Sequence, residues 1–154
     1  MESFQIFKTQ AVEKFKVADH LISTTYPMIR EPKLLVSVIE NLYAALELSI
    51  TALIEYEKSL GQILSYNASI EGRLDIFQRK IMSKYEINQD LVDFILVLKK
   101  TCDEHKKSNI EFRKKDTFVV ADNDYNLIML DFEEVKKTLA KTKNYMNKLF
   151  DIAV

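Results

Sequence analysis

The sequence has very few of the residues that turn or cross-link a chain. Its 154 residues include two glycines, two prolines and one cysteine. This shortage of turn formers favours a few long helices over many short strands. Cys102 stands alone, which excludes an internal disulfide and indicates a protein made in a reducing compartment.

The chain also lacks an excess of charge of either sign. Its 22 lysines and arginines are balanced by 23 aspartates and glutamates. A balanced chain has no overall field that would attract nucleic acid, a membrane surface or a cationic partner. Such a function would therefore need a local cluster of charges.

Targeting and membrane-spanning signals are missing as well. The first ten residues, MESFQIFKTQ, have neither the basic start nor the continuous apolar run of a secretion signal. The most apolar stretch of the chain is interrupted by Glu40, Glu47 and Glu55, so no uninterrupted apolar run is long enough to cross a bilayer. We expect a cytoplasmic protein with no membrane contact.

The sequence contains none of the common catalytic or metal-binding motifs. Gly61 and Gly72 stand alone, so there is no glycine-rich phosphate loop and no serine-hydrolase elbow. His20 and His105 are paired neither with each other nor with a carboxylate at the spacing of a metalloprotease. We expect neither a bound metal nor a cofactor.

Residues 32–58 are the stretch around which the rest of the chain is organised. Apolar side chains recur there every three or four residues, in two adjacent stripes, and a helix this apolar must be covered on several sides. Pro32 suits the first helical position, because its missing N–H would have had no partner there. The first stripe comprises Leu35, Val38, Leu42, Ala45, Ser49, Ala52 and Tyr56, and the second comprises Ile39, Tyr43, Leu46, Ile50 and Leu53.

Amphipathic segments on either side of this stretch predict further helices. A first helix is expected to start at Ser3, as its N-cap, and to end before Tyr26 and Pro27. The buried stripe of a third helix should contain Ile70, Leu74, Phe77 and Ile81.

Two more helices are predicted in the second half, separated by a change of period. Asn88 is placed to cap a fourth helix, which should end near residues 108–109, and Asp131 is placed to cap the last one. Between them, residues 117–121 and 125–130 are rich in branched side chains and flank a polar turn, which is typical of a small β-hairpin; an irregular packed loop is the alternative. The predicted fold is all-α: an up-down bundle of four to five helices in a single domain, residues 1–154.

Two pairs of side chains could in principle perform acid–base or nucleophilic chemistry. Cys102 and His105 lie three residues apart on a predicted helix and are therefore neighbours, but both fall on the side expected to be buried. Glu40 and Glu47 lie two turns apart on the polar strip of the central helix. We interpret the first pair as structural and the second as part of a solvated strip.

The densest cluster of cations lies in residues 99–115. Lysine and arginine release counterions when they contact phosphates, so this basic segment is the best candidate for binding RNA or a nucleotide, with Phe112, Phe118 and Tyr125 as stacking surfaces. The alternative, which we favour, is a solvated helix end whose cations complement the helix dipole. The candidate nucleic-acid-binding residues are Lys106, Lys107, Arg113, Lys114 and Lys115.

Three groups of residues resemble the HEPN superfamily of small helical bundles. Residues 41–45 (NLYAA) followed by residues 50–54 (ITALI) are similar to the second helix of that family. An amphipathic first helix precedes them in the expected place. Residues 112–115 (FRKK), a short insertion with Asp124 and Tyr125, and then residues 132–135 (FEEV) leading into a final helix resemble the carboxyl half.

The resemblance implies a helical bundle that usually dimerises. Many HEPN proteins are RNases that use no metal, and others are noncatalytic partners of nucleotidyltransferases or components of toxin–antitoxin pairs. The RNase members carry an arginine followed a few residues later by a histidine that acts as the acid–base group. Arg113 is the only arginine placed for that role, but no histidine follows it in residues 114–130, and His105 precedes it.

These observations lead to three functional expectations. We expect a nonenzymatic HEPN-like module that acts through protein association, with an RNA or nucleotide contact at its basic end. The alternatives are a degenerate metal-independent RNase that uses Arg113 and His105, and a purely structural bundle. We also expect a homodimer, because the two apolar stripes of the central helix exceed what a small bundle can cover.

Overall fold

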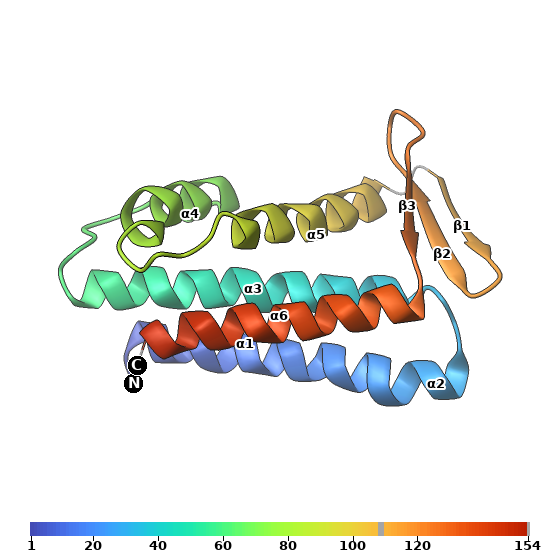
Figure 1. The fold of residues 1–154 in the computed structure, drawn as a ribbon, viewed down its shortest axis with the longest axis horizontal. Helices are drawn as coiled ribbons and strands as arrows, with labels where there is room; N and C mark the ends of the chain where they lie inside the picture. Colours follow the sequence, from blue (N-terminus) through green and yellow to red (C-terminus); the bar gives the residue numbers. More distant parts are fainter. Residues whose placement is uncertain (108–109, 154) are drawn as a thin grey trace.

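The structure of the chain, a computed structural model, describes residues 1–107 and 110–153. It is predominantly helical, with long helices lying side by side and a small antiparallel sheet at one end (Figure 1). Both chain termini lie at the opposite end (Figure 1). The elements are α1 (Ser3–His20), the π-helical turn η1 (Leu21–Thr25), α2 (Tyr26–Ile29), α3 (Leu34–Ser59), α4 (Ile70–Ile76), the π-helical turn η2 (Phe77–Met82), α5 (Asp90–Lys107), β1 (Ile110–Lys114), β2 (Thr117–Ala121), β3 (Leu127–Leu130) and α6 (Phe132–Ile152).

The central helix is confirmed as α3, which α1, α5 and α6 contact along its length. It begins at Leu34, two residues later than predicted, because Pro32 lies in the turn before it. At its other end Gly61 adopts a left-handed conformation (φ +76°), and the N–H of Gln62 donates to the carbonyl of Glu57. This Schellman-type cap ends the helix at Ser59, one residue beyond the predicted stretch.

The first helical segment extends further than the sequence suggested. Glu2 rather than Ser3 is the N-cap, and it forms a capping box with Gln5. The prediction that the segment ends before Tyr26 and Pro27 is wrong, because η1 and α2 continue it to Ile29. A proline removes one backbone donor and crowds the preceding turn, and the wider π-helical turn just before Pro27 leaves room for its ring.

The all-α prediction is wrong for the segment before the last helix. The predicted hairpin is confirmed as β2 and β3, and the strand β1, which was not predicted, extends it to a three-stranded antiparallel sheet in the order β1, β2, β3. β3 starts at Leu127 rather than at residue 125, and β1 falls on a segment that we had interpreted only as a cluster of cations. The predicted end of the fourth helix, residues 108–109, lies outside the described residues.

The last helix follows its prediction closely. The side chain of Asp131 accepts the N–H of Glu134 at 2.8 Å, so Asp131 is the N-cap of α6. Val135, Thr142, Met146 and Leu149 are buried along one face, as the periodicity predicted. This stripe packs on α3, and the chain therefore crosses from the sheet back to the end where it began.

The two apolar stripes of α3 do not remain on the surface. Ile39, Leu46, Ile50 and Leu53 are at most 3% exposed within the single chain. Thr51, which we had placed on the polar strip, is buried as well. The argument for a homodimer through α3 therefore fails, and any association surface must lie elsewhere.

One helix passes a length-and-composition test for a membrane span. Among the described residues this is α3 alone, which contains 26 residues. The core helix of a globular domain passes the same test, and neighbouring helices pack against α3. The observation is therefore weak support for a membrane-spanning segment.

The central position of α3 leads to a stability prediction. Replacing Leu46 with Ala should lower the free energy of unfolding by roughly 2–5 kcal/mol, because it leaves a cavity at a fully buried position. Replacing Leu64, which is 88% exposed, with Ala is the matched control and should change that free energy by less than about 0.5 kcal/mol. Urea unfolding followed by circular dichroism measures both. Equal midpoints would show that α3 is not the centre of the core.

Candidate association surface and basic segment

The face of the sheet that points away from the helices is apolar. Residues paired across antiparallel strands lie on the same face, so the register Phe112–Val119–Met129 forms one row and Ile110–Ala121–Leu127 forms the next. The four edge-strand residues in these rows are between 42% and 56% exposed. We call the six residues of the two rows the outer sheet face: Ile110, Phe112, Val119, Ala121, Leu127 and Met129.

The opposite face of the sheet belongs to the core of the protein. Phe118, Val120 and Leu130 are buried members of the main hydrophobic cluster, and Ile128 packs against it. The sheet covers the N-terminal end of α3, opposite the chain termini (Figure 1). The inner face is therefore covered by the rest of the chain, whereas on the outer face the residues of the two edge strands stay exposed.

The middle strand explains why both faces are apolar. A strand with one face in water normally alternates apolar and polar side chains. Residues 118–121 of β2 instead read Phe-Val-Val-Ala, with no polar residue on either face, and all four are at most 6% exposed. The sequence of β2 is thus typical of a strand that is covered on both sides.

The two turns of the sheet carry opposite charges. Lys114 ends β1 and Lys115 lies with Asp116 in the turn to β2, which leaves that turn net positive, whereas Asp122 and Asp124 lie in the turn between β2 and β3, at the other end of β2. The Asp122 carboxylate accepts the N–H groups of Asp124 (2.9 Å) and Asn126 (2.8 Å), and these hydrogen bonds lower its pKa. The acidic turn is therefore held in shape and stays ionised.

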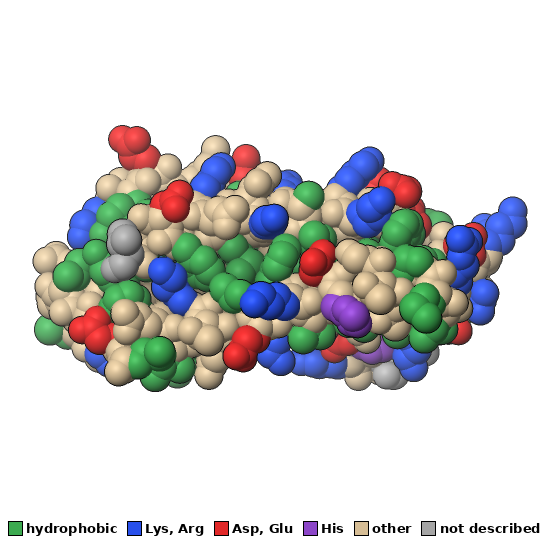
Figure 2. Space-filling model, turned by 90° about the horizontal axis from the view of Figure 1, so that it is seen from below, with side chains coloured by type: hydrophobic (Ala, Val, Ile, Leu, Met, Phe, Trp, Pro, Cys, Tyr) green, Lys and Arg blue, Asp and Glu red, His purple; other side chains and the backbone are tan. Residues whose placement is uncertain are grey.

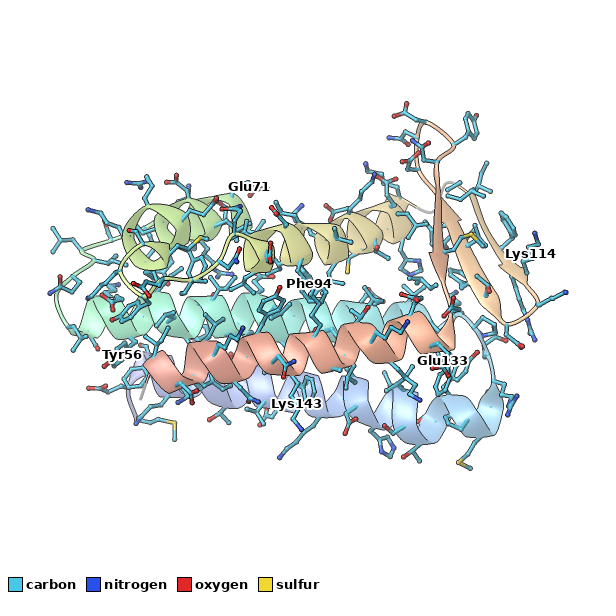
Figure 3. All side chains as sticks on the ribbon, viewed as in Figure 1. Tyr56, Glu71, Phe94, Lys114, Glu133 and Lys143 are labelled. Atoms are coloured by element: carbon cyan, nitrogen blue, oxygen red, sulfur yellow. The ribbon has the colours of Figure 1, made fainter. Side chains whose placement is uncertain are left out.

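The cations of the basic segment lie at the sheet end of the molecule. Lysine and arginine side chains gather at that end in the space-filling view (Figure 2), and Lys114 projects outward from it (Figure 3). Of the predicted stacking residues, Phe118 is buried in the core and cannot stack on a base, which corrects our expectation. The candidate nucleic-acid-binding residues, all exposed, are Lys106, Lys107, Arg113, Lys114 and Lys115.

Arg113 and His105 have different carboxylate partners. Arg113 lies 3.6 Å from Glu31 of the connection between α2 and α3, and its Nε donates to the carbonyl of Lys115. His105 Nδ1 lies 2.5 Å from Glu111 Oε2, at the start of β1. Each side chain is therefore positioned by its own carboxylate.

The Cys102 and His105 pair lacks the properties of a nucleophile and its base. The Cys102 thiol is buried, and burial raises its pKa to about 12, with Glu40 adding to the effect. A thiol with so high a pKa is protonated at neutral pH and is a poor nucleophile. The structural interpretation of this pair is therefore supported.

The second pair, Glu40 and Glu47, is also accounted for structurally. Glu47 accepts a hydrogen bond from Arg73 of α4 at 2.6 Å, so it forms a cross-helix ion pair. Glu40 is half-buried close to Cys102 and contributes to the raised pKa of that thiol. His20 is exposed near the end of α1, as expected.

Sequence reasoning missed a buried carboxylate on α3. The Glu57 side chain is only 2% exposed, and Lys84 Nζ donates to it at 2.9 Å. The hydroxyl of Tyr85 donates to its other oxygen. Burying a carboxylate is costly unless it is paired and hydrogen-bonded, and these two contacts supply that pairing. Because Glu57 stands among ordinary surface residues of α3 in the sequence, no local pattern distinguishes it.

A search of the described residues finds no group of three or more His, Cys, Asp or Glu side chains that could hold a metal ion. Comparisons of the chain with protein-family models, with curated proteins and with solved structures found no match. The functional interpretation therefore depends on the geometry described above and on the sequence resemblance.

The raised pKa of Cys102 leads to a second prediction. Because the native thiol stays protonated up to a pKa of about 12, a thiol reagent such as Ellman's reagent should react with the native protein at pH 8 far more slowly than with the urea-unfolded chain. The unfolded thiol ionises near pH 8.5 and the native one does not, so stability should also fall as the pH rises above that value. A Cys102→Ala variant is the control for both measurements. Equal reaction rates for native and unfolded protein would contradict the assignment.

Proposed function

We propose that this chain is a nonenzymatic HEPN-like helical module that acts through protein association, and that the outer sheet face is where it associates. One observation carries the proposal: the outer sheet face is apolar, and its four edge-strand residues, Ile110, Phe112, Leu127 and Met129, stay 42–56% exposed. An exposed apolar surface of this kind, next to charged residues, is typical of interaction sites. The sequence resemblance to HEPN proteins points in the same direction.

The partner that best fits the outer sheet face is a second copy of the same chain. Two sheets can stack face to face with their strands nearly aligned and about 10 Å apart. If the twofold axis runs across the strands, the basic turn of each copy lies over the acidic turn of the other. Lys114 and Lys115 of each copy would then lie opposite Asp124 of the other copy. The twofold axis makes this contact occur twice, so the surface is complementary to itself.

The first experiment disrupts the apolar part of this surface. The wild-type protein should be a dimer by light scattering at tens of micromolar. Met129→Glu should be monomeric, because it places a charge in the centre of the buried contact; Met129 is 56% exposed, so the monomer itself should still fold. Met28→Glu is the matched control, since Met28 is 80% exposed on α2, outside the outer sheet face, and it should remain dimeric.

A second experiment tests the orientation of the two copies. Replacing Lys114 and Lys115 with Glu should weaken the dimer by about tenfold or more, and adding Asp124→Lys should restore much of the loss, because the charges would again be opposite. A wild-type protein that is monomeric at tens of micromolar would overturn the self-association proposal. Rescue that fails while Met129→Glu still disrupts the dimer would reject the orientation alone.

RNA binding at the basic segment is a second candidate function. Its support is that Phe112 and Lys114 lie on the same face of β1 and that Arg113, Lys114 and Lys115 are all exposed. Three nearby acidic partners reduce the local charge, namely Glu31, Glu104 and Asp122. We therefore expect weak binding that falls steeply with added salt.

The test for RNA binding is a titration of labelled single-stranded RNA. A triple Ala variant at Arg113, Lys114 and Lys115 should bind more weakly than the wild type, whereas Lys143→Ala on α6 should bind equally well. Equal affinity of the triple variant would reduce the basic segment to a solvated surface. Metal-independent cleavage that is lost in His105→Ala would instead support the degenerate RNase with Arg113 and His105.

The resemblance also bears on other partners and on location. A nucleotidyltransferase or a toxin–antitoxin type protein remains our proposal for a different protein partner of the same outer sheet face. A cytoplasmic location likewise remains a proposal, supported by the single cysteine. Co-purification with the products of adjacent genes would test the partner.

A further inference from the structure

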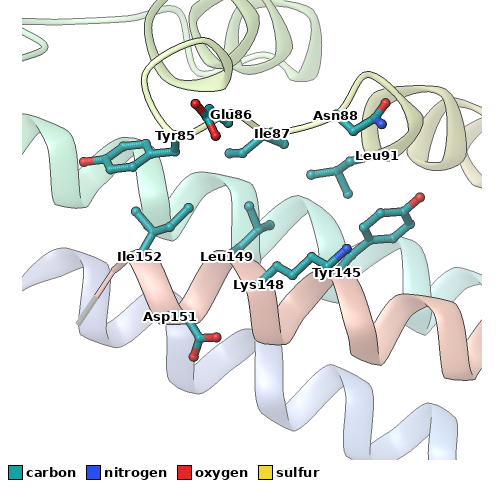
Figure 4. Close-up of a pocket in the computed structure, with 10 residues that line it drawn as sticks. All are labelled: Tyr85, Glu86, Ile87, Asn88, Leu91, Tyr145, Lys148, Leu149, Asp151 and Ile152. Carbon is teal, nitrogen blue, oxygen red and sulfur yellow. The ribbon is translucent and has the colours of Figure 1, made fainter.

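A pocket of about 350 Å³ lies at the other end of the molecule from the sheet turns. It is enclosed between the connection from η2 to α5 and the last turns of α6 (Figure 4). Its volume is at the lower end of the range of small-molecule sites in proteins. The residues that line it most directly are Tyr85, Ile87, Leu91, Tyr145, Leu149 and Ile152.

The interior of the pocket is apolar. Leu91 and Leu149 are at most 2% exposed, and Ile87 and Ile152 are half-buried around them. These four aliphatic side chains point toward the same space in the close-up view (Figure 4). An apolar ligand body would be removed from water there, which is the main source of affinity in such sites.

One wall of the pocket is fixed in advance. Tyr85 borders the pocket, and its hydroxyl donates to Glu57, which is buried and paired with Lys84. Lys84 Nζ also lies 5.2 Å from the centre of the Tyr85 ring. The ring is thus held by a buried carboxylate and a cation before any ligand arrives, so little freedom is lost on binding.

The mouth of the pocket has polar groups that the chain does not use. Within residues 1–107 and 110–153, Lys148 has no carboxylate within ion-pair distance, and its ammonium lies 6.0 Å from the centre of the Tyr145 ring. The Tyr145 hydroxyl has no hydrogen-bond partner in the same described part of the chain, and burial together with Asp90 and Asp93 raises its pKa, so it remains a donor. Lys148 and Tyr145 therefore both border the pocket, with the Tyr145 hydroxyl at the end of its ring that points away from the Lys148 nitrogen (Figure 4).

We propose that this pocket binds a small hydrophobic monocarboxylate. The aliphatic or aromatic body would lie on Leu91 and Leu149, and the carboxylate would accept a charge-assisted hydrogen bond from Lys148 Nζ. Glu86 and Asp151 also border the pocket, with Asp151 pointing away from its interior (Figure 4). Together with Asp90 and Asp93 near Tyr145, these acids oppose any anion and oppose a dianion twice as strongly, so the single cation Lys148 favours a monocarboxylate over a phosphate monoester. The proposal is independent of the association surface.

The probe is octanoate, with octanol and octylammonium as comparison ligands of the same chain length. Binding is followed by titration calorimetry and by chemical shift changes of the pocket amides. Octanoate should bind more tightly than octanol, and octylammonium should bind least well. Lys148→Met should weaken octanoate binding by about tenfold, because it removes one charge-assisted hydrogen bond, and should leave octanol binding unchanged.

Two further variants distinguish the contribution of the Lys148 charge to binding from that of the apolar cavity. Lys143→Met is the matched control, because Lys143 is an exposed lysine of the same helix that does not line the pocket, and it should bind octanoate like the wild type. Ile87→Trp should fill the pocket and abolish binding of both octanoate and octanol while the thermal melt remains cooperative. Absence of saturable octanoate binding at millimolar concentrations would overturn the proposal. So would an equal loss in Lys143→Met, or binding that survives Ile87→Trp.

Discussion

The structure depends on the need to cover a helix that is apolar around most of its circumference. α3 has buried side chains on every side, and each neighbouring helix contributes one apolar stripe to cover part of it. A helix of this kind would aggregate or enter a membrane if its neighbours did not surround it. The short connections and the sheet that closes its N-terminal end follow from the same requirement. The inner sheet residues Phe118, Val120 and Leu130 continue the core beyond the point where the helices end.

The charges of the chain are balanced locally as well as in total. Buried or half-buried carboxylates such as Glu57, Glu47 and Asp122 each have a cationic or backbone partner. The same kind of pairing lowers the net positive charge of the basic segment, because Lys107 lies 3.4 Å from Glu104 and Arg113 lies 3.6 Å from Glu31. The surface therefore carries less net positive charge at this cluster than the sequence alone suggests. This is why the apolar outer sheet face, rather than the charge, supports the leading proposal.

Helices with a long, regular period could be predicted from the sequence, and the elements that depend on tertiary contacts could not. The two stripes of α3, the presence of α5 and α6 and the cap at Asp131 follow from local spacing, and the structure confirms them. β1 was missed because residues 110–114 are a short segment in which only Ile110 and Phe112 are apolar, and they become a strand only by pairing with β2. A helix that continues through Pro27 requires the π-helical turn before it, for which the sequence has no signal.

Gly72 and the candidate pocket also depend on tertiary contacts, so local sequence does not predict them. A Cβ at position 72 would lie 2.4 Å from the carbonyl oxygen of Asn67, so only glycine fits there. The pocket brings the residues after η2 together with the last turns of α6, which are about 60 residues apart in the chain. Side chains that meet only through the tertiary fold, such as Glu57 and Tyr85, leave no local pattern in the sequence.

The position of the termini has a consequence for the shape of any assembly. Both ends of the chain lie at the pole opposite the sheet, and α3 alone, with 26 residues, is about 39 Å long. Two copies that meet at their sheets would form a rod with a pair of termini at each tip. A protein domain or a fluorescent label fused to either terminus would lie beyond the tips and would not contact the middle of the rod. Such a dimer is therefore a spacer that holds two attachments far apart.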